Sequence, residues 1–496
     1  MGRGLLVLTP IDYRKLNGRR RIYSNYTEIN ESNVLEVLGD ALAVHITNAA
    51  QIEYLYNYYR GNQPVYDRVK DVRADIKNYV LRNIAYEIVE FKKGYNFGNG
   101  VQYIKRSACI DKGKPVADNA ITALNELMLT QDKETLDLEL GESILVAGIG
   151  HRFVRAVKPE GVQDAPFEVS TLDSRRTFVV YNSGAGEEPL MSVTISKDTD
   201  GKDFYFIYTP KYIFQTYNNN EVTKSINPIG TIPVIEYDLN PSRIGAFEPV
   251  IGLLDAINTI ESNRVDAIEQ LVQAILVFEN CDIDDELFKS LKRDLAIKIK
   301  GEAGNPAKLY YVSPELNQDQ TQTTIEDIYT SILTICCVPD RNASAGGNTG
   351  AALQVAEGWA SAESRAKSDM IMFKKPERRF LRVVMKIINM STLPYPCKNL
   401  CIGDIDIKAD REKNQNLLTK TQGLLNLLEA GIEPSIACAN VGLFNDPQLV
   451  ADSSPNMEKW AKAKQQEQTT SRKLEDIQAD TKNTENNPNN ANNIEQ

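Results

Sequence analysis

The sequence is poor in histidine, because only two of its 496 residues, His45 and His151, are of this type. Neither lies in a recognisable arrangement with a serine, a cysteine or a metal ligand. Since histidine is the commonest general base, this scarcity argues against a hydrolase. No phosphate-binding G-x-x-x-x-G-K-[ST] loop occurs either, because Pro115 and Asp203 follow the two Gly-Lys pairs. The sequence therefore predicts no catalytic residue, no ATP site and no cofactor.

Cysteines are few and scattered, and their number, seven, is odd. Such a set predicts free thiols rather than a disulfide framework. The strongest apolar runs, residues 144–149 and 274–278, are far shorter than the ~20 residues that cross a bilayer. The N-terminus has no sustained apolar segment, so we expect neither a secretory signal nor a membrane partner. Acidic pairs such as Asp404 and Asp406 are common on protein surfaces, so we predict no metal site.

The charge balance is acidic, with 56 Lys and Arg residues, 67 Asp and Glu residues and a net charge of −11. Hydrophobic residues at 42% and charged residues at 25% are typical of soluble globular proteins, so most of the chain should fold. Tight sequence-independent binding of DNA requires clustered Lys and Arg. We therefore expect any DNA partner to be handled without being held tightly.

The first half of the chain predicts a mixed domain of helices and strands. Residues 51–91 carry apolar residues at helical spacing, with an interruption at residues 61–64. From about residue 100 to 240, short alternating runs are separated by Gly, Pro, Asn and Asp, which is typical of strands and turns. The predicted strands are residues 101–104, 144–146, 167–169, 177–181, 192–195, 204–208, 212–216 and 234–237.

A long helix is predicted next, from Pro249 to about residue 277. One side of this helix is apolar, and we expect it to be packed, whereas the other side is acidic. The apolar side carries Val250, Leu254, Ile257, Val265, Ile268, Val272 and Ile275, and the acidic side carries Asp255, Glu261, Asp266 and Glu269. A small insert follows, with strands predicted at residues 296–300 and 308–312. A second helix is predicted at residues 323–338.

The last third predicts a loop, helices and a polar tail. Residues 339–350 are polar and rich in glycine, so we expect a mobile loop there. Residues 351–390 are helical in pattern, and Pro376 predicts a kink. Residues 410–449 are helical again, with Gly431 as a C-terminal stop. The tail, residues 464–496, lacks the apolar residues that a core requires.

Five stretches of the sequence occur in an informative order. They are residues 58–61 (YYRG), 83–98 (NIAYEIVEFKKGYNFG), 227–237 (NPIGTIPVIEY), 247–258 (FEPVIGLLDAIN) and, less tightly matched, 431–447. In this order they resemble the portal proteins of tailed double-stranded DNA bacteriophages. The likeness spans about residues 50–450, and the proline-rich approach to the long helix is its most specific part.

The resemblance implies an α+β, mostly helical portal fold, with an α/β wing, a two-helix stem, a small α/β clip, a long kinked helix and a helical crown. It divides the chain into an N-terminal arm (1–50), the wing (51–240), a stem helix (241–278), the clip (279–318), a second stem helix (319–338), a tunnel loop (339–350), the kinked helix with a second part of the wing (351–405), the crown (406–463) and a disordered polar tail (464–496).

The resemblance also implies a function without catalysis. We expect a dodecameric ring in the virion, at one capsid vertex, assembled in the host cytoplasm. Double-stranded DNA would pass through it during packaging and ejection. The expected partners are the large terminase subunit, a head-completion adaptor, and the major capsid and scaffolding proteins. An acidic lumen would let a polyanion slide rather than bind.

Three groups of candidate site residues follow from this assignment. The tunnel loop would face DNA through Arg341, Asn342, Ser344, Asn348 and Thr349. The stem would line the channel with Asp255, Glu261, Asp266 and Glu269. The clip would face the terminase or an adaptor with Lys289, Lys292, Arg293, Lys298, Lys300 and Lys308. For the first group, the alternative is that the loop is only an exposed connector. For the third group, a solvated surface explains the charges almost as well as a docking role.

Two other functions remain open at this point. A metal-dependent phosphodiesterase would require three or so carboxylates that converge on Mg²⁺, and the sequence shows no such signature. A monomeric helical adaptor of the virion would lack a channel and would sediment as a single species of 55.5 kDa.

Overall fold

The protein divides into two compact units, residues 1–409 and 410–496. The computed structural model describes residues 18–70, 74–106, 118–217, 221–272, 275–279, 308–312, 318–340, 358–409 and 417–441, with the single residues 306, 443, 450 and 454. Within the second unit, helices α10 (Leu417–Glu429) and α11 (Pro434–Val441) pack against each other. The remaining elements belong to the first unit.

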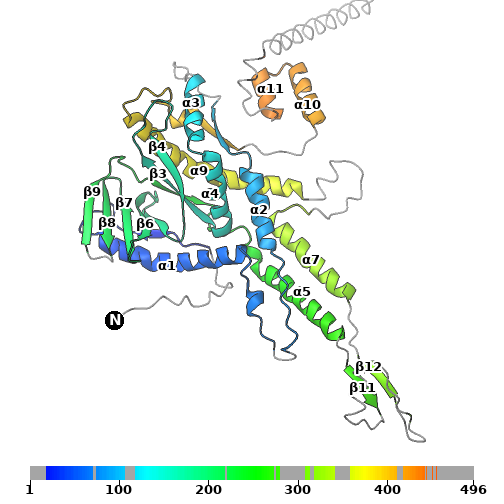
Figure 1. The fold of residues 1–496 in the computed structure, drawn as a ribbon. Helices are drawn as coiled ribbons and strands as arrows, with labels where there is room; N and C mark the ends of the chain where they lie inside the picture. Colours follow the sequence, from blue (N-terminus) through cyan, green and yellow to red (C-terminus); the bar gives the residue numbers. More distant parts are fainter. Residues whose placement is uncertain are drawn as a thin grey trace, which may run out of the picture. The chain divides into compact units, whose positions relative to one another are not determined.

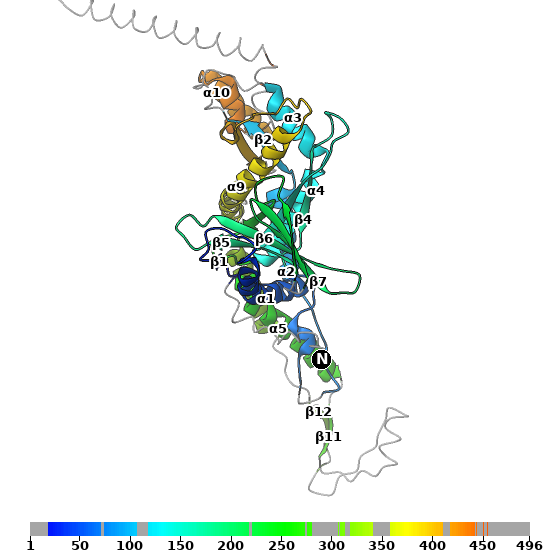
Figure 2. The ribbon, with the colours of Figure 1, turned by 90° about the vertical axis from the view of Figure 1, so that its left-hand side faces the viewer.

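A six-stranded sheet with the strand order β1-β5-β6-β7-β8-β9 forms one layer of the first unit. Its strands are β1 (Ile22–Ser24), β5 (Thr177–Asn182), β6 (Pro189–Lys197), β7 (Asp203–Tyr208), β8 (Tyr212–Tyr217) and β9 (Glu221–Ile226). Helix α1 (Val34–Tyr59) runs along this sheet (Figures 1 and 2). Val34 and Leu38 of the helix share a buried apolar cluster with Val193, Ile207 and Phe214 of the strands. Burial of this shared face stabilises the layer.

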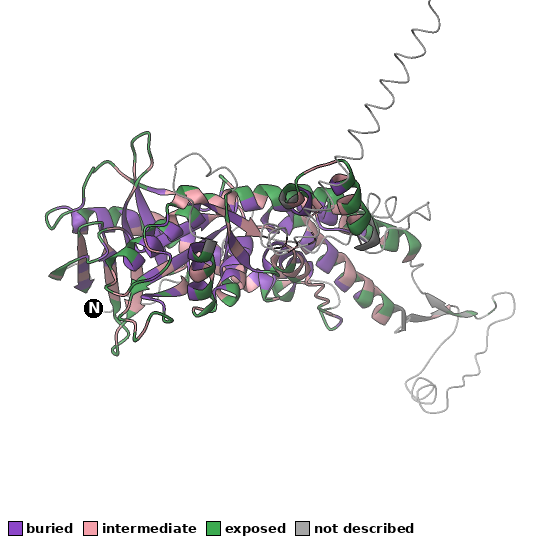
Figure 3. Cartoon of the chain, turned by 90° about the horizontal axis from the view of Figure 1, so that it is seen from above, coloured by how far each residue is buried: buried purple, intermediate pink, exposed green. Residues whose placement is uncertain are grey.

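A second layer contains the main hydrophobic core. Strands β3 (Ile149–Ala156), β4 (Phe167–Leu172) and β10 (Val234–Asp238) form an antiparallel sheet with the order β10-β3-β4. Helices α4 (Lys133–Ala147) and α9 (Trp359–Met390) pack on it. Figure 3 shows the buried residues concentrated in this body of helices and strands.

A two-stranded sheet brings distant parts of the chain together. Strand β2 (Val101–Lys105) pairs antiparallel with β13 (Ile405–Ala409). Helix α2 (Ile84–Phe97) packs on α4, and α3 (Asp118–Leu129) packs on β2. The one-turn helix η5 (Ile402–Asp404) precedes β13. Because β13 pairs with β2, the boundary between the units falls after Ala409.

The long helices that leave this body complete the first unit. After the short helix η4 (Glu248–Val250), helix α5 (Ile251–Val272) leads to strand β11 (Ile275–Glu279). Strand β12 (Lys308–Val312) pairs antiparallel with β11, and helix α7 (Gln318–Cys336) then packs against α5 (Figure 1). The short helix η2 (Pro64–Asp67) also contacts α5.

The α+β prediction is confirmed, and most predicted strands are present. The strand at residues 144–146 is wrong, because these residues end helix α4. Leu140 and Ile144 form its buried stripe, and Gly148 ends it in a left-handed conformation at φ 78°. A short apolar run does not distinguish a buried strand from the last turn of a buried helix.

Two further boundaries differ from the prediction. The long helix ends at Val272 rather than near residue 277, because Ile275–Glu279 is strand β11. Strand β12 pairs with β11, and the predicted strand at residues 296–300 lies outside the described residues. The second helix of the 51–91 region begins only at Ile84, because residues 74–83 run along α5 without helical structure. Helix α9 continues through Pro376 to Met390.

Candidate functional site

Helices α5 and α7, which we call the stem helices, are the centre of the candidate site. Arg264 of α5 links them, since its Nε donates to Gln318 Oε1 at 2.6 Å and its Nη1 to Gln322 Oε1 at 2.8 Å. Their buried apolar residues are Ile251, Leu254, Ile257, Ile325, Ile332 and Leu333. Apart from these residues and the buried Asn258, Ser262, Asp266 and Cys336, the described side chains of both helices are half-buried or exposed. The pair therefore has a narrow internal contact and much uncovered surface.

A stripe of polar residues on α5 binds an extended segment of the same chain. Asp266 Oδ1 accepts the Asn78 backbone N–H at 2.7 Å, Ser262 Oγ accepts that of Val80 at 3.0 Å, and Asn258 Oδ1 accepts that of Arg82 at 2.9 Å. Four helical residues rise about 6 Å, and two extended residues span about 6.6 Å. The rise of four helical residues thus matches the length of two extended residues. The backbone N–H groups of residues 78, 80 and 82 therefore each donate to one side chain of α5.

Asp266 carries the strongest electrostatic interactions of this stripe. Its Oδ2 lies 2.7 Å from Arg68 Nη2 and 3.1 Å from Lys70 Nζ, and its side chain is 4% exposed. Burial alone raises the pKa of a carboxyl. Hydrogen bonds from the Asn78 N–H, Lys70 and Arg68 outweigh that effect and lower the pKa of Asp266 to about 2. This carboxylate therefore anchors residues 68–78 to the stem.

The four predicted channel-lining carboxylates have different surroundings. Asp255 accepts a hydrogen bond from the Tyr58 hydroxyl at 2.8 Å, and burial raises the pKa of Asp255. Asp266 makes the ion pairs described above, and Glu269 Oε2 accepts from Asn78 Nδ2 at 2.7 Å. Glu261 is half-buried. Three of the four are thus bonded within the chain, and the lining role of all four stays a prediction.

The predicted division of α5 into a packed apolar side and an acidic side is wrong in its second half. Val265 is 37% exposed and Ile268 45% exposed, whereas Asp266 is 3% exposed. The polar stripe turns toward residues 78–82 because backbone N–H groups that leave water require acceptors. Asn258 and Ser262 were not among the predicted site residues, although Asn258, Ser262 and Asp266 follow one another at intervals of four residues, which was a usable signal.

Buried ion pairs fix the connection that leads from the body into α5. Arg243 Nη2 lies 2.6 Å from Glu236 Oε2, and Arg19 Nη2 lies 2.5 Å from Glu248 Oε1. Burial raises the pKa of Glu236, but Arg243 and a nearby histidine lower it more strongly. A Cβ on Gly148 would lie 2.3 Å from the Arg243 carbonyl oxygen, so glycine is required for this close approach. The orientation of α5 is thereby set by the body.

A second buried network fixes α9, the helix that follows the predicted tunnel loop. Glu377 accepts hydrogen bonds from the hydroxyls of Tyr103 and Tyr237, each at 2.6 Å. It also lies 3.0 Å from Lys133 Nζ and 3.2 Å from Arg152 Nη1. Burial opposes the charge, but Lys133 and Arg152 lower the pKa of Glu377. The network joins α9 to α4, β2, β3 and β10.

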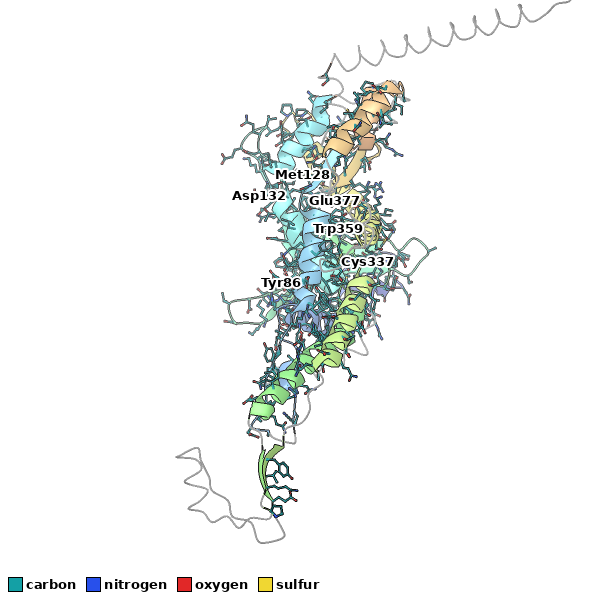
Figure 4. All side chains as sticks on the ribbon, turned by 90° about the vertical axis from the view of Figure 1, so that its right-hand side faces the viewer. Tyr86, Met128, Asp132, Cys337, Trp359 and Glu377 are labelled. Carbon is teal, nitrogen blue, oxygen red and sulfur yellow. The ribbon has the colours of Figure 1, made fainter. Side chains whose placement is uncertain are left out.

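The start of α9 packs beside α2 through aromatic rings. The Trp359 ring lies 5.9 Å from Phe91 and 6.0 Å from Tyr95, measured between centroids. Figure 4 shows Trp359 and Glu377 on α9 and Cys337 just beyond the end of α7. Both stretches that flank residues 341–357 are therefore anchored to the body.

One polar group resembles a hydrolytic triad in its geometry. The Oγ of Ser174 lies 2.9 Å from His151 Nδ1, and His151 Nε2 lies 3.2 Å from Glu236 Oε2. Ser174 is 1% exposed and His151 is fully buried, so a substrate cannot reach the hydroxyl. We assign this group to the interior of the fold. Over the described ranges, no cluster of three or more His, Cys, Asp or Glu residues suits a metal ion.

The loop and clip residues are largely beyond what the structure describes. Arg341, Asn342, Ser344, Asn348 and Thr349 lie outside the described residues, as do Lys289, Lys292, Arg293, Lys298 and Lys300. Lys308 is exposed at the start of β12, opposite Glu279 in the strand register. In the part of the chain that can be examined, no helix has the length and apolar character to cross a bilayer.

Comparison with known proteins gives one match over most of the chain. The model of the family described as "Phage portal protein, SPP1 Gp6-like" matches residues 39–470. No curated protein matches the chain. The virion of a native gene transfer agent particle contains a chain of similar fold, with a TM-score of 0.42, 14% identity and coverage of 79% of this chain and 93% of that chain. A chain in the neck of an empty particle of the same kind, computed with C6 symmetry, is also similar. Its TM-score is 0.41 and its sequence identity 14%, and the match covers 73% of this chain and 90% of that chain.

Proposed function

Because the chain belongs to the phage portal protein family of the SPP1 Gp6-like type, we propose that it forms a ring at one vertex of a phage capsid. The observation that carries this proposal is the family match over residues 39–470. In this function double-stranded DNA enters and leaves the capsid through the ring. Twelve copies form the ring in the virion, and the terminase and a head-completion adaptor dock on it.

The exposed apolar residues of the stem helices support assembly of several copies. Val265 and Ile268, near the end of α5, are 37% and 45% exposed. Clusters of exposed apolar residues mark interaction sites in proteins. The polar stripe of α5 is already used by residues 78–82, so the apolar side is the side that remains for a neighbouring copy.

The experiment is the measurement of particle size for the purified full chain. Sedimentation and negative-stain images are expected to show rings, whereas a monomeric adaptor would sediment as 55.5 kDa. The double variant Val265→Asp/Ile268→Asp is expected to remain monomeric, because a buried unpaired carboxylate is costly. The matched control is Ile226→Asp on β9, whose side chain is 77% exposed. A wild-type chain that stays monomeric at high concentration would overturn the proposal.

The DNA path is tested separately from assembly. Of the four stem carboxylates, Glu261 is the best probe, because the other three are bonded within the chain. Glu261→Lys is expected to slow DNA packaging into purified proheads while rings still form, because a cation in an acidic lumen would hold the phosphates. Deletion of residues 343–349 is expected to impair packaging or DNA retention before it impairs folding. Unchanged packaging in both variants would contradict the proposed path.

A further inference from the structure

A basic face of α9 borders a cavity that the proposed function does not use. Arg379, Arg382 and Lys386 line it, and their spacing of three and four residues places them on one side of the helix. Within the described residues, no carboxylate lies within ion-pair distance of either guanidinium. This basic face is unusual in a chain whose net charge is −11.

A second part of the cavity wall is formed by Gly230, Thr231 and Ile232, which belong to the turn at residues 227–233 within the proline-rich stretch. Asn227 holds the turn rigidly, because its Nδ2 donates to the carbonyl oxygens of Thr209 at 2.7 Å and Thr231 at 2.8 Å. Lys386 Nζ donates to the Gly230 carbonyl oxygen at 2.8 Å. Gly230 has a φ of 67°, and a Cβ there would lie 3.0 Å from Lys386 Nζ. The most specific part of the family pattern thus builds a wall against α9.

The cavity has an apolar lining and a net positive charge. Its volume is about 360 Å³, and its apolar lining residues are Val179, Pro189, Pro210, Ile232, Val234, Ile235 and Val383. Two carboxylates also line it. Glu236 is compensated by Arg243 at 2.6 Å, and Glu188 is exposed. The lining of the cavity therefore has three cationic side chains, Arg379, Arg382 and Lys386, and one carboxylate without a compensating cation among the described residues, Glu188.

We propose that this cavity, which we call the α9 pocket, binds an acidic segment of another protein, with an apolar side chain in the pocket and carboxylates on the three cations. Guanidinium groups bind carboxylates through two parallel hydrogen bonds. The apolar lining favours a peptide over DNA, because a phosphodiester backbone carries no apolar side chain. The convex backbone of a duplex also does not enter a cavity of this size. The inference goes beyond the proposed channel function, because it adds a docking site for a protein.

The test measures peptide binding to the full chain by fluorescence anisotropy at low salt. The probe is a short fluorescein-labelled peptide in which glutamates flank a single leucine. Binding is expected at concentrations below about 1 mM. Replacing the glutamates by glutamines, or the leucine by serine, is expected to weaken binding at least about tenfold, because each removes one half of the recognition. A duplex DNA is measured in parallel.

Variants of the protein locate the site. Arg379→Gln and Arg382→Gln are each expected to weaken binding about tenfold, because each removes a charge-assisted hydrogen-bond donor. The matched control is Lys367→Gln, on the same helix but more than two turns from the pocket, and it is expected to leave binding unchanged. Equal weakening by all three variants, absence of peptide binding, or tighter binding of the duplex would overturn the inference. Ring formation, measured on the same samples, separates this failure from that of the channel proposal.

Discussion

Replacing Asp266 by asparagine tests the interaction between the stem and residues 78–82. The amide has nearly the same shape and its oxygen still accepts the Asn78 N–H, whereas the charge and the oxygen that accepts from Arg68 and Lys70 are lost. Lowering the pKa from 3.8 to about 2 corresponds to about 2.4 kcal/mol in favour of the charged form, at ~1.36 kcal/mol per pKa unit. The side chain is 4% exposed, so little of this is lost to solvent screening. The variant is therefore expected to open the contact about 60-fold more often.

The assay is amide hydrogen exchange of the intact protein, read at Asn78, Val80 and Arg82. These N–H groups are expected to exchange faster in Asp266→Asn, and the matched control Glu261→Gln on the same helix is expected to leave them unchanged. A carboxylate with a lowered folded pKa stabilises the fold above its unfolded pKa, and this is lost as pH falls through the folded value. The difference between wild type and variant should thus close between about pH 4 and 2. Unchanged exchange at neutral pH would refute the reasoning.

Three further predictions concern the body. Burial lowers the pKa of His45 in the folded protein to about 4, from 6.5. As the pH falls, the unfolded chain therefore binds a proton at this residue before the folded protein does. The free energy of unfolding should drop by about 2 kcal/mol between pH 7.5 and 5, and an equal drop in His45→Gln would contradict this. Glu377→Ala leaves the fully buried Arg152 without one of its carboxylate partners. The free energy of unfolding, measured by chemical denaturation, should fall by about 3–5 kcal/mol. The control Lys367→Gln should lower it by less than about 1 kcal/mol. Gly230→Ala places a Cβ at a residue with positive φ, so the free energy of unfolding should fall by about 1–2 kcal/mol in the same measurement. An unchanged value would show that the turn adapts to the side chain without strain.

Much of the fold could be predicted because its signals are local. The break between the helices near Gly61, the strands between residues 167 and 237, and the stop at Gly431 each depend on neighbouring residues. The order of the five stretches pointed to the portal family, and the family match over residues 39–470 confirms it. The local features could be predicted correctly because turn residues and apolar periodicity determine structure over only a few residues.

The direction in which α5 faces could not be predicted from its own pattern. Its apolar residues suggested that Val265 would be buried, but the structure buries Asp266 instead. The deciding partners, Arg68 and Asn78, lie almost 200 residues earlier in the chain. No spacing within the helix reports a hydrogen bond to a distant backbone.

The sequence by itself determined the family, through the order of the five stretches, and the presence of the stem helices, through their apolar periodicity. Only the tertiary structure decided which carboxylates are used internally and which cations gather around one cavity. It paired β2 with β13 and brought the turn at residues 227–233 against α9. Contacts of this kind depend on chain segments far apart in sequence, and their energies appear only once the fold brings the groups within hydrogen-bonding distance.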